Sequence, residues 1–232
     1  MRTTPDALML FTAGLGTRMG ALTANRPKPL IEVGGRALID HALAQVEGAG
    51  IGWVVANLHY LPEQIIAHLS LYRDIRFSAE TETLLETGGG LRKALPLLGD
   101  GPVFTLNTDA VWTGANPLTE LRDAWDADRM DGLMLLVPTA RASGHSGPGD
   151  FDRDADGRLT RGRSFVYTGA QIVATTGLAA IPAQVFSLNL LWDRMLADGR
   201  LFGLVHDGGW CDVGRPESIP VAEALLREAA GV

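Results

Sequence analysis

The sequence predicts an α/β protein with a Rossmann-like, mainly parallel sheet and helices on both faces. Short apolar runs rich in β-formers alternate along the chain with helical patterns, which is typical of a parallel sheet crossed by helices. The 232 residues, 46% of them hydrophobic, are enough to bury one full core. No internal repeat, low-complexity tract or coiled-coil heptad interrupts this alternation. We therefore expect a single domain over residues 1–232.

The first half of the chain accounts for most of the predicted sheet. Strands are expected at residues 7–12, 52–57, 74–79, 102–107 and 132–137. Helices are expected between them, at 37–49, 61–70, 89–97 and 117–128. In such a sheet, ligands bind at the edge where the strands end, so the loops after these strands are expected to carry the site.

The second half begins with a change of composition. Residues 141–164 are rich in glycine, aspartate and arginine, and Asp152 to Arg158 predicts a hairpin turn. A calcium loop is the less favoured alternative there, because the EF-hand glutamate and flanking helices are absent. Beyond it we expect a helix at 186–197, a strand at 201–206, a strand that breaks between Trp210 and Arg215, and a last helix at 216–229.

Composition narrows the classes of partner. The formal net charge of −7 argues against general nucleic-acid binding. No apolar run approaches the roughly 18 residues of a membrane span, and residues 1–6 lack the features of a signal peptide. The single cysteine, Cys211, fits a reducing compartment. We expect a cytoplasmic protein with no nucleic-acid or membrane partner.

A glycine-rich segment, Gly14 to Gly20, follows the first strand. Glycines after a strand leave backbone N–H groups open to a phosphate, although such glycines also occur in ordinary turns. Arg18, Arg26 and Lys28 add positive charge nearby, and Lys28 is one of only two lysines among 20 Lys+Arg. A lysine between two prolines, in a chain that otherwise uses arginine, indicates a need for a compact ammonium. We interpret the segment as a cradle for a nucleoside triphosphate, although it is neither a Walker A loop nor a good dinucleotide fingerprint.

Two carboxylates follow strand ends. Asp109 comes just after the run 103–107, and Asp212 lies where the strand at Trp210 breaks into glycine and proline. Hard oxygen ligands at a sheet edge suit Mg²⁺, which takes one or two carboxylates plus substrate phosphates. A helix cap or Asx-turn is the structural alternative for each. Asp207, close to Asp212, is interpreted as a loop residue.

Other polar segments at expected strand ends are weaker candidates. Residues 86–90, Glu-Thr-Gly-Gly-Gly, open a helix, where glycine lets a base or ribose pack on backbone and the helix offers free N–H donors. A flexible helix entry is the alternative. Asn57 is placed to contact sugar hydroxyls, and Thr168 and Gly169 are interpreted as a sugar-facing turn at a strand end, each with an equally strong structural alternative.

The combination G-x-G-T-R-M with R-P-K-P-L ten residues later resembles the signature of the sugar-1-phosphate nucleotidyltransferases, and the resemblance runs through most of the chain. It implies a nucleotide-diphospho-sugar transferase (GT-A-like) fold, with the sugar-binding part at 141–215 inserted in the same domain. It also implies roles for individual residues. These are catalysis by Arg18 and Lys28; nucleotide binding by Ala13, Gly14, Gly16, Thr17, Glu80, Thr87, Gly88 and Gly89; sugar binding by Asn57, Asn107, Thr168 and Gly169; and Mg²⁺ binding by Asp109 and Asp212.

The resemblance implies attack by a sugar 1-phosphate on the α-phosphorus of a nucleoside triphosphate, releasing pyrophosphate. E-T-G-G-G at 86–90 is similar to the branch of uridylyltransferases that act on N-acetylmuramic acid 1-phosphate, in recycling of cell-wall sugars. UTP and that sugar phosphate are thus the expected partners of a monomer or small homo-oligomer. A mannose-1-phosphate guanylyltransferase, a phosphocholine-type cytidylyltransferase and a non-catalytic nucleotide-sugar sensor of the same fold are the alternatives.

Overall fold

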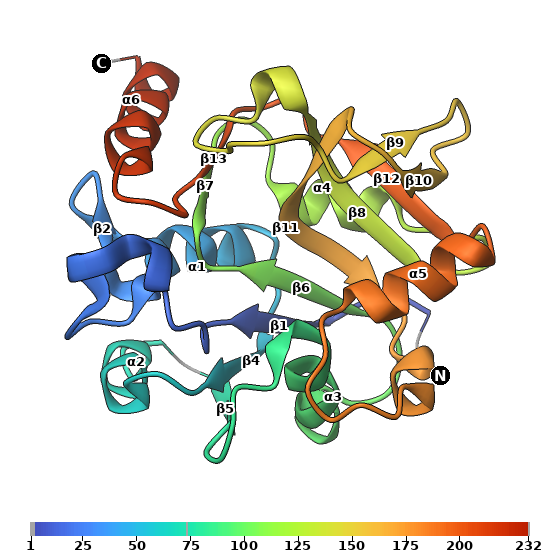
Figure 1. The fold of residues 1–232 in the computed structure, drawn as a ribbon, viewed down its shortest axis with the longest axis horizontal. Helices are drawn as coiled ribbons and strands as arrows, with labels where there is room; N and C mark the ends of the chain where they lie inside the picture. The colour runs from blue at the N-terminus through green and yellow to red at the C-terminus, as the bar shows by residue number, and fades with distance from the viewer. Residues whose placement is uncertain (1–2, 73, 232) are drawn as a thin grey trace.

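The central sheet organises the molecule (Figure 1). The computed structural model describes residues 3–72 and 74–231. Its main sheet runs in the order β12-β8-β11-β6-β1-β4-β5, and the hairpin β9–β10 joins it beside the start of β11. The strands of this sheet are β1 (Ala7–Phe11), β4 (Trp53–Leu58), β5 (Ile75–Ala79), β6 (Val103–Asn107), β8 (Gly132–Pro138), β9 (Phe151–Arg153), β10 (Leu159–Arg161), β11 (Phe165–Val173) and β12 (Leu201–Val205).

Strand directions confirm the mainly parallel sheet. β1 pairs in parallel with β4 and β6, β4 with β5, and β8 with β12. β11 runs antiparallel to both of its long neighbours, β6 and β8. The carboxyl ends of β1, β4 and β6 therefore share one edge, on the left in Figure 1.

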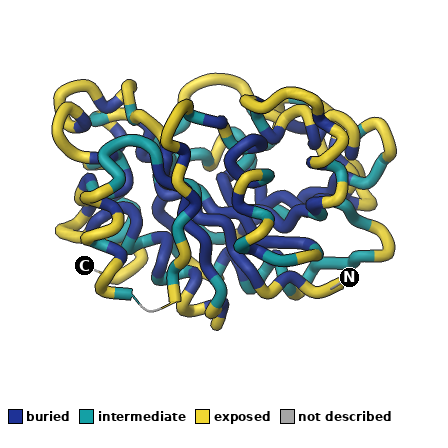
Figure 2. Tube along the Cα trace, turned by 90° about the horizontal axis from the view of Figure 1, so that it is seen from below, coloured by how far each residue is buried: buried dark blue, intermediate teal, exposed yellow. Residues whose placement is uncertain are grey.

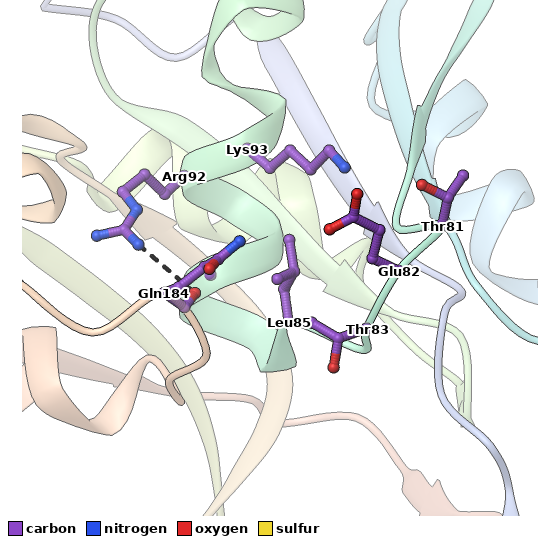
Figure 3. Close-up of a pocket in the computed structure, with 8 residues that line it drawn as sticks. Thr81, Glu82, Thr83, Leu85, Arg92, Lys93 and Gln184 are labelled. Atoms are coloured by element: carbon purple, nitrogen blue, oxygen red, sulfur yellow. Dashed lines mark hydrogen bonds between the residues drawn. The ribbon is translucent and has the colours of Figure 1, made fainter.

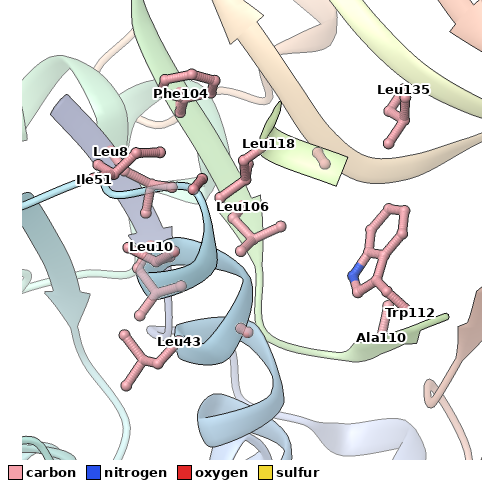
Figure 4. Close-up of a cluster of buried hydrophobic side chains, with 14 of the residues drawn as sticks. Leu8, Leu10, Leu43, Ile51, Phe104, Leu106, Ala110, Trp112, Leu118 and Leu135 are labelled. Atoms are coloured by element: carbon pink, nitrogen blue, oxygen red, sulfur yellow. The ribbon is translucent and has the colours of Figure 1, made fainter. Parts of the chain in front are cut away.

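Helices cover both faces, as predicted. α1 (Leu38–Gly48), α2 (Pro62–Leu69) and α4 (Pro117–Ala124) bury apolar residues in one cluster with Leu8, Leu10, Phe104 and Leu106 of the sheet (Figure 4). α3 (Glu86–Leu98) and α5 (Asn189–Ala197) bury theirs in a second cluster with the alternate strand residues, such as Met9. The buried trace in Figure 2 runs through the middle of the molecule, with exposed loops around it. Burial of apolar area on both faces of the strands is the main force that holds the sheet.

A third, smaller cluster closes the edge where the strands end. There the ribbon β7 (Ala110–Trp112) and β13 (Trp210–Asp212) packs with α6 (Ser218–Ala230) and with Met19, Ile31 and Leu38. The short strands β2 (Glu32–Val33) and β3 (Arg36–Ala37) pair with each other beside it. Short 3₁₀ segments complete the chain: η1 (Thr17–Thr23), which is interrupted by a kink at Gly20, η2 (Lys28–Leu30), η3 (Thr139–Arg141) and η4 (Thr176–Ala180).

Three helix boundaries differ from prediction by three residues or more, and the others by two or fewer. The helix expected over 117–128 ends at Ala124, because Trp125 turns to extended backbone and donates its indole N–H to the carbonyl of Thr3. The helix expected over 186–197 begins at Asn189, since the preceding residues are bound to the start of α3. The helix expected over 89–97 begins at Glu86 and so includes all three glycines of 88–90.

The sequence predicts turns in two regions, and the structure confirms only the first. The hairpin predicted at Asp152 to Arg158 is confirmed as β9–β10, closed by the Asp154 carboxylate accepting from the Arg158 backbone N–H. The interpretation of Thr168 and Gly169 as a turn at a strand end is wrong. Both lie inside β11, at a register shift between Tyr167 and Gln171. None of the helices in the described part of the chain is both long and apolar enough to cross a membrane.

Candidate active site

A cavity of about 290 Å³ lies where β1 and β6 end. The predicted site residues among its lining are Ala13, Gly14, Lys28, Asn57, Thr87, Asn107 and Asp109. Their elements are far apart in sequence, and the shared edge of the parallel strands brings them together. The loops that follow these strands thus meet at one cavity, at the edge of the sheet where the site is expected.

Lys28 is held rigidly at this cavity. It opens η2 between Pro27 and Pro29, and the main-chain bonds from Leu30 N to Pro27 O and from Ile31 N to Lys28 O fix the turn. Its Nζ lies 2.8 Å from Oδ2 of Asp109, and the lysine side chain is 12% exposed. An ammonium enclosed in this way has little freedom to move, so its positive charge is in position before a ligand binds.

Gly16 is the glycine of the predicted cradle with a defined steric reason. Its φ is +64°, and a Cβ there would lie 2.9 Å from Lys28 Cβ and 2.9 Å from Thr23 Cγ2. Gly16 therefore allows the loop to pack directly against the side chains of Lys28 and Thr23. A Cβ at Gly14, by contrast, would meet nothing within 4 Å, so its backbone faces open space at the cavity.

The predicted carboxylates converge through a β-ribbon. Asp212 of β13 pairs with Ala110 of β7, and the N–H of Val213 donates to the carbonyl of Asp109 at 2.7 Å. Burial, followed by the negative charge of Asp109, raises the pKa of Asp212, while Lys28, Arg18 and His145 act in the opposite direction. The two carboxylates therefore lie close enough to repel each other, and Lys28 and Arg18 are the cations near them.

Arg18 lies on the Asp212 side of this centre and does not line the cavity. One of its guanidinium nitrogens would be 3.3 Å from a Cβ at Gly214, close to the carboxylate of Asp212. Arg18 is exposed, and with Arg215 it lines a separate groove of about 510 Å³. The groove and the cavity thus flank the carboxylate pair from two sides.

Asn57 and Glu80 form a buried support under the site. The Asn57 side chain accepts from Thr12 N at 2.8 Å and donates to the Glu80 carboxylate at 2.7 Å. The other oxygen of that carboxylate accepts from Leu85 N at 2.7 Å, and Glu80 is 1% exposed. Both Glu80 oxygens therefore have partners within the chain, which ties the loop after β1 to the start of α3.

The glycines of α3 pack against protein. The N–H groups of Gly88 and Gly89 both donate to the carbonyl of Phe186, so the expectation of free donors at this helix start is wrong. A Cβ at Gly88 would come within 2.4 Å of the Phe186 ring, and one at Gly90 within 2.7 Å of the Glu80 carboxylate. Close packing of helix on chain explains these glycines.

A second cavity, of about 390 Å³, lies on the other side of this helix start and includes Gly89 (Figure 3). Lys93 and Glu82 extend into it, whereas Arg92 turns away toward the main chain of Gln184. Lys93, the second lysine, is therefore separated from the cavity that holds Lys28.

The wall formed by β6 and β11 contains the other predicted sugar-binding residues. Gly169 has φ +87°, and a Cβ there would lie 2.9 Å from Asn107 Cβ. Thr168 is buried, its hydroxyl donates to Leu135 O, and its carbonyl accepts from the indole of Trp210. The bulge in β11 thus brings its backbone against Asn107 at the cavity.

Sequence reasoning missed several lining residues. They are Phe11, Thr12, Pro29, Leu84 and Thr108. Most of them directly adjoin a predicted site residue, so including the chain neighbours of each candidate finds Thr12, Pro29 and Thr108. Leu84 lies two residues before α3, whose start is predicted only at residue 89, so no predicted element includes it.

Comparison with known proteins agrees with this geometry. Residues 8–148 match the family described as the MobA-like NTP transferase domain, and the chain belongs to that family of nucleotidyltransferases. It is 41% identical to N-acetylmuramate alpha-1-phosphate uridylyltransferase of Caulobacter vibrioides, over 99% of this chain and 100% of the relative. It is 28% identical to mannose-1-phosphate guanyltransferase of Aspergillus fumigatus, over 94% of this chain and 63% of the relative.

A solved nucleotidyltransferase structure has the same fold. A solved UDP-glucose pyrophosphorylase, in complex with UDP-glucose, superposes with a TM-score of 0.80 at 13% identity and covers 97% of this chain and 99% of its own. The predicted nucleotide-diphospho-sugar transferase fold is thereby confirmed.

Proposed function

We propose that this protein transfers uridylyl from UTP to N-acetylmuramic acid 1-phosphate, releasing pyrophosphate. The observation that carries the transfer chemistry is the rigid Lys28–Asp109 pair, joined to Asp212 through the β7–β13 ribbon at one cavity. The choice of UTP and of the muramic acid derivative is supported by full-length similarity to the Caulobacter enzyme. The reaction belongs to recycling of cell-wall sugars in the cytoplasm, a compartment that fits a free, buried Cys211.

The chain's own groups suit this reaction. The attacking phosphate is already an anion, so the barrier is alignment and charge repulsion rather than proton removal. Lys28 holds one positive charge at the cavity where the α-phosphate and the incoming phosphate meet. Arg18, in the groove beyond Asp212, is placed to take the departing pyrophosphate.

The carboxylate pair fits Mg²⁺. Asp109 and Asp212 are hard oxygen donors, and the raised pKa of Asp212, caused by burial and by the charge of Asp109, supports a preference of the pair for a cation between them. When bound, Mg²⁺ supplies charge neutralisation at the phosphates. Among the described residues no group of three or more His, Cys, Asp or Glu side chains could hold a metal, so Asp109 and Asp212 would hold the ion together with ligands from the substrates.

The acceptor is assigned to the wall made by residues 141–215, where Thr168 and Gly169 face Asn107. Two arginines that precede β11, Arg161 and Arg163, are candidate donors to the lactyl carboxylate of this acceptor. Arg161 is engaged by Asp193 and Asn189. Arg163 is exposed on the loop before β11 and is the better candidate.

The test is a pyrophosphate-release assay with the four NTPs at equal concentration, Mg²⁺ and a panel of sugar 1-phosphates. The expected result is release with UTP and N-acetylmuramic acid 1-phosphate. A preference for GTP and mannose 1-phosphate would replace the proposal by the guanylyltransferase, and a preference for CTP and phosphocholine by the cytidylyltransferase. Binding without release would indicate a sensor. Equal efficiency with N-acetylglucosamine 1-phosphate would show that the lactyl group is not recognised.

A further inference from the structure

Glu86 is held in a backbone conformation that glutamate disfavours. Its φ is +63°, and it shares the left-handed region with only Leu61 and Asp74 among the described non-glycine residues. This conformation is strained for a residue with a Cβ, and glycine would adopt it without cost. A chain with 28 glycines nevertheless has glutamate here.

The neighbours of Glu86 enforce the conformation. Leu85 N donates to Glu80, and Leu85 O accepts from Phe186 N. On the other side, Gly88 N donates to Phe186 O, and Thr87 Oγ1 accepts from Leu188 N. With both sides fixed, Glu86 cannot relax, so its side chain is directed by the fold rather than by its own preference.

The side chain lies at the candidate active site. Glu86 is exposed and lines the cavity that also contains Lys28 and Asp109. Among the described residues, its carboxylate has no hydrogen bond or ion pair. The N–H groups of Gly88 and Gly89 both donate to Phe186 O, and the exposed Glu86 carboxylate is the charged group that this segment presents to the cavity.

We propose that Glu86 determines how the nucleotide lies in the cavity, a claim that rests on the proposed function. A carboxylate repels a triphosphate and accepts hydrogen bonds, and the donors that UTP offers lie on its nucleoside half, as ribose hydroxyls and the base imide N–H. The phosphates then lie toward Lys28 and the nucleoside toward Glu86. The strained backbone is retained because it places this acceptor on the cavity wall.

The test compares two substitutions with one matched control. Glu86→Gln removes the charge and keeps the strained backbone, and Glu86→Gly removes both. Each is expected to raise KM for UTP about tenfold, the loss of one hydrogen bond to a charged group, with KM for the sugar 1-phosphate changed less than twofold. Glu86→Gly is also expected to raise Tm by about 2 °C because the strain is relieved.

Asp74→Gly is the control. Asp74 has φ +66°, is exposed, and precedes β5 at the sheet edge opposite the cavity. It should show a similar rise in Tm with unchanged kinetics. An unchanged KM for UTP in both Glu86 variants would overturn the proposal, as would a larger change in KM for the sugar 1-phosphate.

UTP analogues identify which group of the nucleoside donates the hydrogen bond to Glu86. If a ribose hydroxyl is bound, the difference between wild type and Glu86→Gln disappears with 2′-deoxy- or 3′-deoxy-UTP. If the imide is bound, it disappears with N3-methyl-UTP. A difference that persists with all three would refute the contact. Failure of the proposed function can be distinguished from failure of this proposal. In the first case wild type would release no pyrophosphate, and the ratio of the UTP Kd values of Glu86→Gln and wild type, measured by calorimetry, would still test the role of Glu86.

Discussion

Gly16→Ala tests whether packing against the backbone sets the position of Lys28. Gly16 has φ +64°, and alanine in the left-handed region costs about 1–2 kcal/mol. The new Cβ would also lie 2.9 Å from Lys28 Cβ, an atom fixed between two prolines, so the loop must shift. We expect a total destabilisation of about 2–3 kcal/mol, or a fall in Tm of about 4–10 °C for a chain of this size.

Activity should fall as well, because the shift separates the Lys28 ammonium from Asp109. A displacement of this kind in a pre-positioned charge costs up to about 10²-fold in turnover. Gly50→Ala is the matched control, since Gly50 has φ +67°, a Cβ there would meet no heavy atom within 4 Å, and the residue lies before β4, at the opposite edge. Thermal melts and pyrophosphate release would be measured for both. Equal losses of stability and unchanged turnover in the two variants would refute the reasoning.

Three further changes test other parts of the site. Lys28→Ala should lower turnover by about 10²-fold or more, whereas Lys93→Ala, the substitution of the other lysine, should leave turnover within about twofold; similar effects of both would contradict the role of Lys28. Asp212→Asn should abolish metal-dependent activity yet raise Tm at pH 7. Burial and the charge of Asp109 raise the pKa of Asp212 in the folded protein, so ionisation of Asp212 destabilises the fold at neutral pH. The gain in Tm from Asp212→Asn should therefore vanish as pH falls below the ordinary aspartate pKa of about 3.9. A gain in Tm that grows toward acid pH would contradict this reasoning. Burial and the charge of Asp212 raise the pKa of Cys211 to about 12, so iodoacetamide should alkylate the thiol slowly at pH 8 in the folded protein and rapidly in urea, as mass spectrometry would show; rapid labelling of the folded chain would contradict this.

The sequence predicted the parts of the molecule that local pattern controls. Apolar runs located the parallel strands, and the unusual lysine at position 28 indicated a fixed charge before any contact was known. Local pattern failed where tertiary contacts decide. Thr168 and Gly169 have turn-like chemistry but lie within β11, because pairing with β6 and β8 extends the strand through a bulge.

The glycines of α3 show the same limit. Positions 88–90 were interpreted as a surface for the nucleotide, yet their space is filled by Phe186 and Glu80 from other parts of the chain. Likewise, the resemblance implies nucleotide binding by Glu80, but in the structure both oxygens of its carboxylate have partners, in Asn57 and Leu85. A glycine in the sequence indicates that another group packs closely against the backbone there, but it does not identify that group.

The β7–β13 ribbon also has a consequence for how the protein folds. Asp109 and Asp212 stand on either side of residues 110–211, and they meet only when the ribbon closes. Contacts of such long sequence separation form slowly and late. A chain released before that half has folded can present Lys28 beside Asp109 but holds a single carboxylate. Acquisition of metal affinity during refolding should therefore lag behind the formation of helix signal, and a divalent ion that binds both carboxylates would act as a reporter of the last step of folding.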